Sequence, residues 1–213
     1  MLTLEEKFTI LRNTPVINSR YFVPDLKEKS VVILGSSKNS PSIDKYLQTC
    51  SDITRHFVEN GYNIVSDAGS KGIMGEVFNT AYKYSQKDKN NHPVQNLAIL
   101  TEPLWGDENL EQGVIIGKAK SEAERIQKFA KVSNKFLIFP GSGGTIQEAS
   151  TLVAGNIYGS EPKKIALFGQ EFWKNFENIF KVITDFELLK KPLDQIFKIV
   201  NSKDEVIKFF LKK

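Results

Sequence analysis

Hydrophobic and polar positions alternate along the chain in blocks, each with the period of a strand or a helix. Short β-branched or aliphatic runs, typical of buried strands, lie at residues 29–37, 62–67, 96–101, 113–117, 134–141, 163–169 and 195–200. Segments with a helical period lie between and after them, at residues 40–60, 72–85, 121–133, 145–159, 170–186 and 203–213. A further amphipathic helix is predicted at residues 3–12.

This regular alternation predicts an α/β fold. Strand and helix take turns from residue 31 to the end with short connections, which favours a Rossmann-like, doubly wound, mostly parallel sheet with helices on both faces. Because no change of composition marks a linker, we expect a single domain, with an N-terminal helical extension at 1–29 and a core at 30–213. Ligands of such sheets bind beyond the carboxyl ends of the strands, so the loops there are the place to look for function.

Composition narrows the class only modestly. The 29 Lys and Arg against 25 Asp and Glu give a net charge of +4, with the two signs interleaved, which is a weak indication of an anionic ligand. One cysteine excludes an intramolecular disulfide, and the helical phase of Cys50 predicts a small buried hydrophobe. The first residues lack the basic region of a secretory signal, and no run has the length needed to cross a bilayer. We therefore expect a cytoplasmic protein without membrane contact.

Three loops between strands and helices stand out, at residues 35–42, 66–75 and 140–148. The first does not carry the glycine pattern of a dinucleotide site, because two serines follow Gly35. The third has Gly144-Thr145 without the lysine of a P-loop. These departures count against an NAD site and against ATP hydrolysis.

The third loop nevertheless has the composition of an anion site. Consecutive glycines let backbone N–H groups converge on one point, and the helix expected to begin near Thr145 adds its unpaired amides and its dipole. Two structural alternatives stay open. Thr145 and Glu148 fit a capping box, and Arg125, three residues after Glu122, fits a surface ion pair.

The loops and the helix between them resemble the LONELY GUY-type phosphoribohydrolases, a family long labelled "possible lysine decarboxylase". Residues 140–148, PGSGGTIQE, match the signature P-G-G-x-G-T-x-x-E at every fixed position except Ser142. Residues 67–75 resemble the motif G-G-G-x-x-G-x-M-G, and Gly35-Ser36-Ser37 is also similar to the family. The family's arginine, fifteen residues before the motif's proline, falls on Arg125. The resemblance spans about residues 30–190.

The resemblance implies hydrolysis of the N-glycosidic bond of an AMP-like nucleoside 5′-monophosphate to free base and ribose 5-phosphate, with Glu148 and Arg125 as the catalytic residues. Glu148 would stabilise the ribosyl oxocarbenium ion and guide water, and Arg125 would orient that carboxylate or the sugar hydroxyls. The substrate- and phosphate-binding residues implied are Gly35, Ser36, Gly69, Gly72, Met74, Gly75, Gly141, Ser142, Gly143, Gly144 and Thr145.

No metal and no cofactor are expected. The chain has two histidines, His56 and His92, and neither has a second ligand-type residue at metal-site spacing. Both are predicted to lie at the surface.

Departures from the family pattern bear on substrate preference and on catalysis. Ser142 replaces a glycine, Asp67-Ala68 replaces two glycines, and Ile126 replaces a lysine that follows the family's arginine. The stretch 102–118 matches no assigned part of the family, and part of the base pocket is expected from it or from a neighbouring subunit. Cytokinin precursors and ordinary nucleotides such as AMP both stay open as substrates.

Two other functions also stay open. One is a non-catalytic carrier of a nucleotide or phosphorylated cofactor, as in molybdenum-cofactor carriers of similar fold. The other, binding of single-stranded nucleic acid, is disfavoured because the aromatic residues of 172–180 follow a helical stripe typical of a core or a subunit interface. The resemblance implies a homodimer or a larger homo-oligomer, for which the apolar faces of 172–183 and 152–157 are candidates.

Overall fold

A computed structural model of the protein describes residues 3–13, 15–16, 26–87, 89, 91, 93–102, 108–159, 161–189 and 191–211. His92, for which a surface position is predicted, lies outside these residues. The first described helix is α1 (Leu4–Asn13), in agreement with the predicted N-terminal helix.

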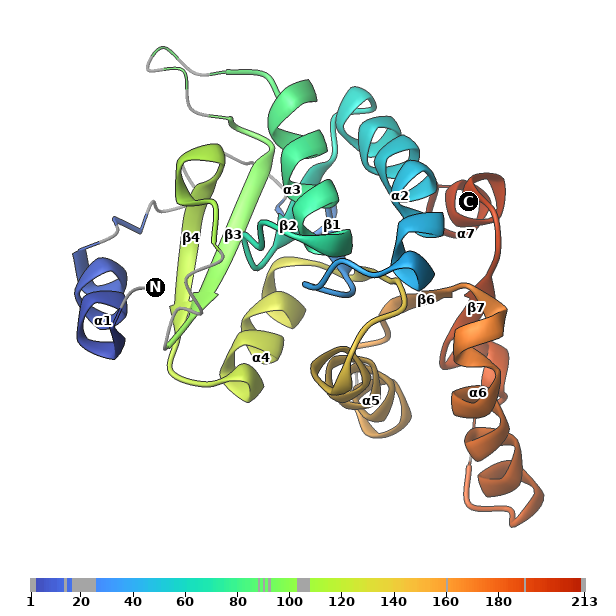
Figure 1. The fold of residues 1–213 in the computed structure, drawn as a ribbon. Coiled ribbons are helices and arrows are strands. Elements are labelled where there is room, and N and C mark those ends of the chain that lie inside the picture. The colour runs from blue at the N-terminus through green and yellow to red at the C-terminus, as the bar shows by residue number, and fades with distance from the viewer. Residues whose placement is uncertain are drawn as a thin grey trace.

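Seven strands form one sheet, with every pairing parallel (Figure 1). Their order across the sheet is β4-β3-β2-β1-β5-β6-β7. The strands are β1 (Ser30–Leu34), β2 (Asn63–Ser66), β3 (Asn96–Thr101), β4 (Val114–Ala119), β5 (Lys135–Ile138), β6 (Lys164–Phe168) and β7 (Lys198–Val200). The predicted α/β class is therefore confirmed, and the sheet is parallel throughout its described strands.

Helices cover both faces of this sheet (Figure 1). One face carries α2 (Pro41–Glu59), α3 (Gly72–Tyr84) and α7 (Lys203–Leu211), and the other carries α4 (Glu122–Val132), α5 (Gly143–Tyr158) and α6 (Gln170–Asp185). Successive side chains of β1 point to opposite faces of the sheet. Val31 and Ile33 pack against the first set of helices, and Val32 and Leu34 pack against the second. Apolar side chains on both faces thus hold the sheet between two helical layers.

The strand order places a topological switch point at β1. From β1 the chain moves through β2 and β3 to the edge strand β4, and α4 then returns it to β5 on the opposite side of β1. The loops after β1 and β5 are joined directly, since the Ser36 amide donates to the Pro140 carbonyl at 3.0 Å. In open parallel sheets the crevice at such a point is the usual ligand site.

Most element boundaries agree with the sequence, and the exceptions have local causes. Gly61, at φ 76°, ends α2 as expected, and Pro41 opens it, but the Ser40 hydroxyl makes no cap hydrogen bond. Helix α5 begins at Gly143, two residues before the predicted start. Strand β7 begins at Lys198 because residues 193–195 form a 3-10 turn.

The predicted apolar faces separate into core and surface. Cys50, Leu152, Val153, Trp173 and Phe176 are buried, so both helical stripes contribute to the core. Other large apolar side chains near the end of α6 are exposed, namely Ile179, Val182, Phe186 and Leu188. Among the residues that the structure describes, no helix combines the length and the apolar character needed to span a membrane.

Candidate functional site

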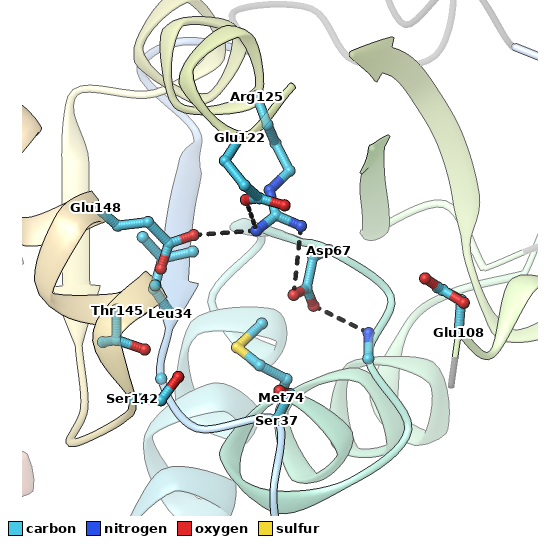
Figure 2. A pocket seen from close by; sticks show the side chains of 13 residues that line it. Leu34, Ser37, Asp67, Met74, Glu108, Glu122, Arg125, Ser142, Thr145 and Glu148 are labelled. Carbon is cyan, nitrogen blue, oxygen red and sulfur yellow. Dashed lines mark hydrogen bonds and ion pairs between the residues drawn. The ribbon is translucent and has the colours of Figure 1, made fainter. Parts of the chain in front are cut away.

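A pocket of about 270 Å³ lies at the carboxyl ends of β1, β2 and β5, and we call it the switch-point pocket (Figure 2). Its volume is near the lower end of small-molecule sites. The residues that line it are Leu34, Gly35, Ser37, Asp67, Gly69, Met74, Glu108, Glu122, Arg125, Ser142, Gly144, Thr145 and Glu148.

The N-terminal end of α5 forms one wall of this pocket. Ser142 is the N-cap residue, and its φ of −86° is ordinary for a serine, so the glycine of the family motif is not needed there for conformation. The first helical bond runs from the Ile146 amide to the Ser142 carbonyl, which leaves the amides of residues 143–145 without an intrahelical partner. A Cβ atom on Gly143 or Gly144 would meet nothing within 4 Å beyond the adjoining backbone of its own helix. The end of α5 is therefore open to a ligand.

The capping-box alternative for Thr145 and Glu148 is wrong. Because α5 starts at Gly143, Thr145 lies within the first turn rather than at the cap, and it is buried. The Glu148 carboxylate instead accepts a hydrogen bond from Arg125 Nη2 at 3.3 Å. Glu148 thus faces the pocket instead of closing its own helix.

Arg125 is held in the first turn of α4 and faces three carboxylates (Figure 2). The Ser121 hydroxyl caps this helix by accepting from the Glu124 amide at 3.3 Å. Arg125 Nη2 lies 2.5 Å from Glu122 Oε2 and 3.3 Å from Glu148 Oε1, and Nη1 lies 3.5 Å from Asp67 Oδ2. The ion pair with Glu122 is present as the sequence allowed, but the arginine side chain is only 10% exposed, so the pair is part of the pocket and not of the surface.

These charges change the acidity of Glu148. Burial is the main cause that raises the pKa of Glu148, to about 8, with Asp67 and Glu122 adding to the rise and Arg125 opposing it. In the free protein at neutral pH, Glu148 is therefore mostly a neutral acid rather than the carboxylate that the sequence suggested.

The loop after β2 places Asp67 beside Arg125. Asp67 Oδ1 accepts from the Gly69 amide at 2.9 Å, and Ala68 between them adopts φ 64°. A left-handed conformation costs an alanine about 1–2 kcal/mol, so the chain keeps at residue 68 the backbone shape that the family's glycine allows freely.

The structure brings together eight of the thirteen predicted site residues. Those that line the switch-point pocket are Gly35, Gly69, Met74, Arg125, Ser142, Gly144, Thr145 and Glu148. Gly143 lies beside it, at the start of α5.

The other four predicted residues shape the loops without lining the pocket. The Ser36 hydroxyl donates to the Lys38 carbonyl at 2.9 Å. A Cβ atom on Gly72 would lie 2.6 Å from the Ser36 carbonyl oxygen, one on Gly75 would lie 2.5 Å from the Ser70 carbonyl, and one on Gly141 would lie 2.1 Å from Thr145 Oγ1. These glycines allow close backbone packing.

Sequence reasoning did not assign Leu34, Ser37, Asp67, Glu108 and Glu122 to the pocket, although Asp67 and Glu122 had drawn notice for other reasons. Glu108 belongs to the stretch expected to supply part of the base pocket. Its neighbour Asn109 donates to the Ala68 carbonyl at 2.8 Å, which ties this stretch to the loop after β2. Glu108 lies across the pocket from Ser142 and Thr145 (Figure 2).

Ile126, which replaces a lysine of the family, is 2% exposed and packs in the apolar core, so its side chain does not line the pocket. Within the described ranges, no group of three His, Cys, Asp or Glu side chains is placed to hold a metal ion.

Comparison with known proteins finds relatives that are named as probable phosphoribohydrolases. A probable cytokinin riboside 5′-monophosphate phosphoribohydrolase of Oryza sativa subsp. japonica, LOG4, is 25% identical over 181 residues, which cover 83% of this chain and 73% of the relative. A second protein of that name from the same plant, LOGL3, is 23% identical over 151 residues, covering 70% and 66%.

Among solved structures, the molybdenum cofactor (Moco) carrier protein of Chlamydomonas reinhardtii is similar in fold, with a TM-score of 0.54, 15% identity and coverage of 85% of this chain and 96% of that one. The molybdenum cofactor binding protein of Rippkaea orientalis gives a TM-score of 0.54 at 13% identity, covering 86% and 95%.

The family described as "Possible lysine decarboxylase" matches residues 74–210, which begin in the first turn of α3 and include the arginine of α4 and the whole glycine-rich turn into α5. Because this match covers more than half of the chain, and the two rice relatives are named as probable phosphoribohydrolases, the chain belongs to this family.

Proposed function

We propose that the protein hydrolyses the N-glycosidic bond of a nucleoside 5′-monophosphate and releases the free base and ribose 5-phosphate. Family membership and the names of the rice relatives support this reaction class. The observation that carries the proposal is the meeting of Arg125 and Glu148 beside the open end of α5.

The phosphate is assigned to the amides of residues 143–145. A helix N-terminus offers unpaired N–H groups and a positive dipole end, and the absence of Cβ atoms at Gly143 and Gly144 leaves room for the phosphoryl oxygens. The buried Thr145 lines the same wall, and its hydroxyl would assist. A phosphate held there sets the ribose beside Glu148 and directs the base toward Gly69 and Glu108.

In this pose the side chains supply what glycosidic cleavage requires. As the bond from C1′ to the base nitrogen breaks, its electron pair leaves with the base and positive charge develops on the ribosyl ring. An ionised Glu148 stabilises that charge and accepts one proton of the attacking water, whose oxygen bonds to C1′. That proton then passes to the departing base, which leaves neutral, and the Glu148 carboxylate is restored. Arg125 fixes the direction of the carboxylate through its fork of donors.

The reaction is tested by incubating the protein with a panel of nucleoside 5′-monophosphates and measuring the free base. We expect release from at least one of them, and a Glu148→Gln rate at least about 100-fold lower. The matched control is Glu124→Gln, since Glu124 is on the same helix as Arg125 but pairs with Lys128 outside the pocket. Release of base that is unchanged in Glu148→Gln would contradict the proposed mechanism.

A non-catalytic carrier of a nucleotide or phosphorylated cofactor is the second candidate. Asp67 favours it, because a carboxylate on Arg125 weakens the positive charge available to the reaction. Saturable binding of AMP without release of adenine, by isothermal titration and by chromatography of the same samples, would support this candidate over the enzyme.

We also propose that the protein assembles as a homodimer or larger homo-oligomer. The exposed apolar side chains of Ile179, Val182 and Phe186 support a self-association surface, because apolar groups gathered in this way are usually covered. Light scattering of the purified protein would test this, and a monomer at all concentrations would contradict it.

A further inference from the structure

The guanidinium of Arg125 contacts three carboxylates in the switch-point pocket, those of Glu122, Glu148 and Asp67. Asp67 is not a residue of the family motif. We propose that Asp67 is a positioning residue: it fixes the fork of Arg125 and sets how strongly that guanidinium acts on Glu148. The role of Asp67 in catalysis rests on the proposed function. Its effect on Arg125 and on the pKa of Glu148 can be measured on the protein alone.

The loop after β2 gives Asp67 a fixed orientation. Its Oδ1 accepts from the Gly69 amide at 2.9 Å, so Oδ2 is the oxygen left to face Arg125 Nη1 at 3.5 Å (Figure 2). The carboxylate is 19% exposed, which leaves it little water to screen the interaction. Ala68 is completely buried at φ 64°, so the backbone at this turn is held by its surroundings.

Glu122 fixes the other nitrogen of the fork. Its Oε2 lies 2.5 Å from Arg125 Nη2, and its Oε1 accepts from the Thr101 hydroxyl at 3.2 Å. The guanidinium is therefore held on both terminal nitrogens by carboxylates other than Glu148. Glu148 contacts Nη2 at 3.3 Å, sharing it with Glu122.

This sharing determines the charge that Glu148 experiences. The charged groups of the pocket that face it are Arg125 and Glu122 from α4, Asp67 from the loop after β2, and Glu108 from the opposite wall. Asp67 repels the ionised form of Glu148 directly, and it also engages the arginine that would otherwise favour that form. Both effects act in the same direction, so removing the charge of Asp67 lowers the pKa of Glu148.

Asp67→Asn separates charge from shape. Asparagine keeps the shape and a side-chain oxygen for the Gly69 amide, but its NH2 group cannot accept from Arg125, so the negative charge and this acceptor are lost together. Asp67→Gly restores the residue of the family motif. Asp185→Asn is the matched control. Asp185 is exposed at the end of α6, so this substitution removes the same charge at a position away from the pocket.

The experiment is a pH titration of the Glu148 side-chain carboxyl carbon by 13C NMR, with the signal assigned by its loss in Glu148→Gln. We expect the midpoint to fall by about one pH unit in both Asp67 variants and to stay unchanged in Asp185→Asn. Midpoints equal to that of the unaltered protein in both Asp67 variants, with the fold intact by amide chemical shifts, would overturn the inference.

The pH dependence of base release, measured on the same variants, separates this inference from the proposed function. If the NMR midpoint moves and no nucleotide is hydrolysed, the role of Asp67 stands and the proposed reaction fails. If hydrolysis occurs but its acid limb is the same with and without the Asp67 charge, the reaction stands and the positioning role fails.

Discussion

Arg125 Nη2 lies 3.3 Å from Glu148 Oε1, although the two residues belong to different helices, α4 and α5, which precede and follow β5 in the chain. Both side chains are nine-tenths or more buried at the edge of a pocket. A single contact of this kind links the electrostatics of the site to the stability of the fold.

The rate of base release should depend on pH through Glu148. With its pKa raised to about 8, the ionised form is a minority at pH 6 and 7, so kcat/KM should rise roughly tenfold per pH unit below 8 and then level off. A profile measured from pH 5.5 to 9.5 checks this. A rate that is flat from pH 6 upward would show that the ionisation of Glu148 does not limit the reaction.

The same pKa has a consequence for stability. Because folding raises the pKa of Glu148 from about 4.5 to about 8, its contribution is fully present below pH 4.5 and is lost as the pH rises toward 8. The side chain of Glu148→Gln does not titrate. The free energy of unfolding of this variant should therefore rise, relative to that of the unaltered protein, by up to about 1.4 kcal/mol per pH unit across that window. Urea unfolding of both proteins at pH 5.5 and 8.5 measures the difference, which should be larger at the higher pH.

Arg125→Lys should reduce kcat far more than it reduces stability. An ammonium keeps the charge between the carboxylates but cannot span Asp67, Glu122 and Glu148 with a planar fork. We expect a loss of about 100- to 1,000-fold in kcat, the size typical of removing one oriented donor from an active site. Steady-state kinetics and thermal unfolding of the variant check this, and a loss below threefold would argue against an orienting role.

Gly144→Ala should weaken phosphate binding without disturbing the fold. Gly144 lines the pocket, and a Cβ atom there would project into open space, so on the proposed placement it would crowd the phosphate. We expect affinity for AMP or ribose 5-phosphate to fall at least about tenfold, which corresponds to 1.4 kcal/mol.

The matched control for Gly144→Ala is Gly155→Ala, a glycine of the same helix with equally open surroundings but away from the pocket. It should leave affinity unchanged and add up to about 1 kcal/mol of stability through helix propensity. Isothermal titration measures the affinity of both variants for AMP or ribose 5-phosphate. Equal affinities in the two variants would contradict the assignment of the phosphate to this turn.

Gly141→Ala should have the opposite pattern, a loss of stability. Its Cβ atom would lie 2.1 Å from Thr145 Oγ1 and 2.9 Å from the Ser36 amide nitrogen. Relief requires the Thr145 side chain to shift and the loops after β1 and β5 to move apart, for which we expect about 1–3 kcal/mol of destabilisation. Chemical unfolding measures it, and a variant as stable as the unaltered protein would show that this contact relaxes freely.

The sequence was sufficient for the fold because strand and helix periods are local properties. Runs such as VVIL in β1 have no polar side chain to place on either face, and this predicts a strand buried on both sides of a parallel sheet. The predicted start of α5 was wrong because the sequence of Thr145 and Glu148 fits a capping box. Only the tertiary contact of Glu148 with Arg125 shows that Glu148 does not cap the helix.

The site could be predicted only as far as its motifs extend. Glycine spacing pointed to the right loops, but it could not distinguish Gly144, which faces open space, from Gly141, which is packed against Thr145. Glu108 was not predicted because its place depends on how the segment after β3 folds back onto Ala68, and no local pattern records that contact.

The pairing of β1 with β5 joins residues about a hundred positions apart in the chain, Val32 with Phe136, whereas β1 and β2 pair across a much shorter separation. Closing the longer loop is the more costly step entropically, so the two halves of the sheet are expected to meet late during folding. Since Arg125 and Glu148 flank β5 while Asp67 follows β2, the pocket does not exist until that meeting. Affinity for a nucleotide should therefore be among the last properties to return when the denatured chain is refolded.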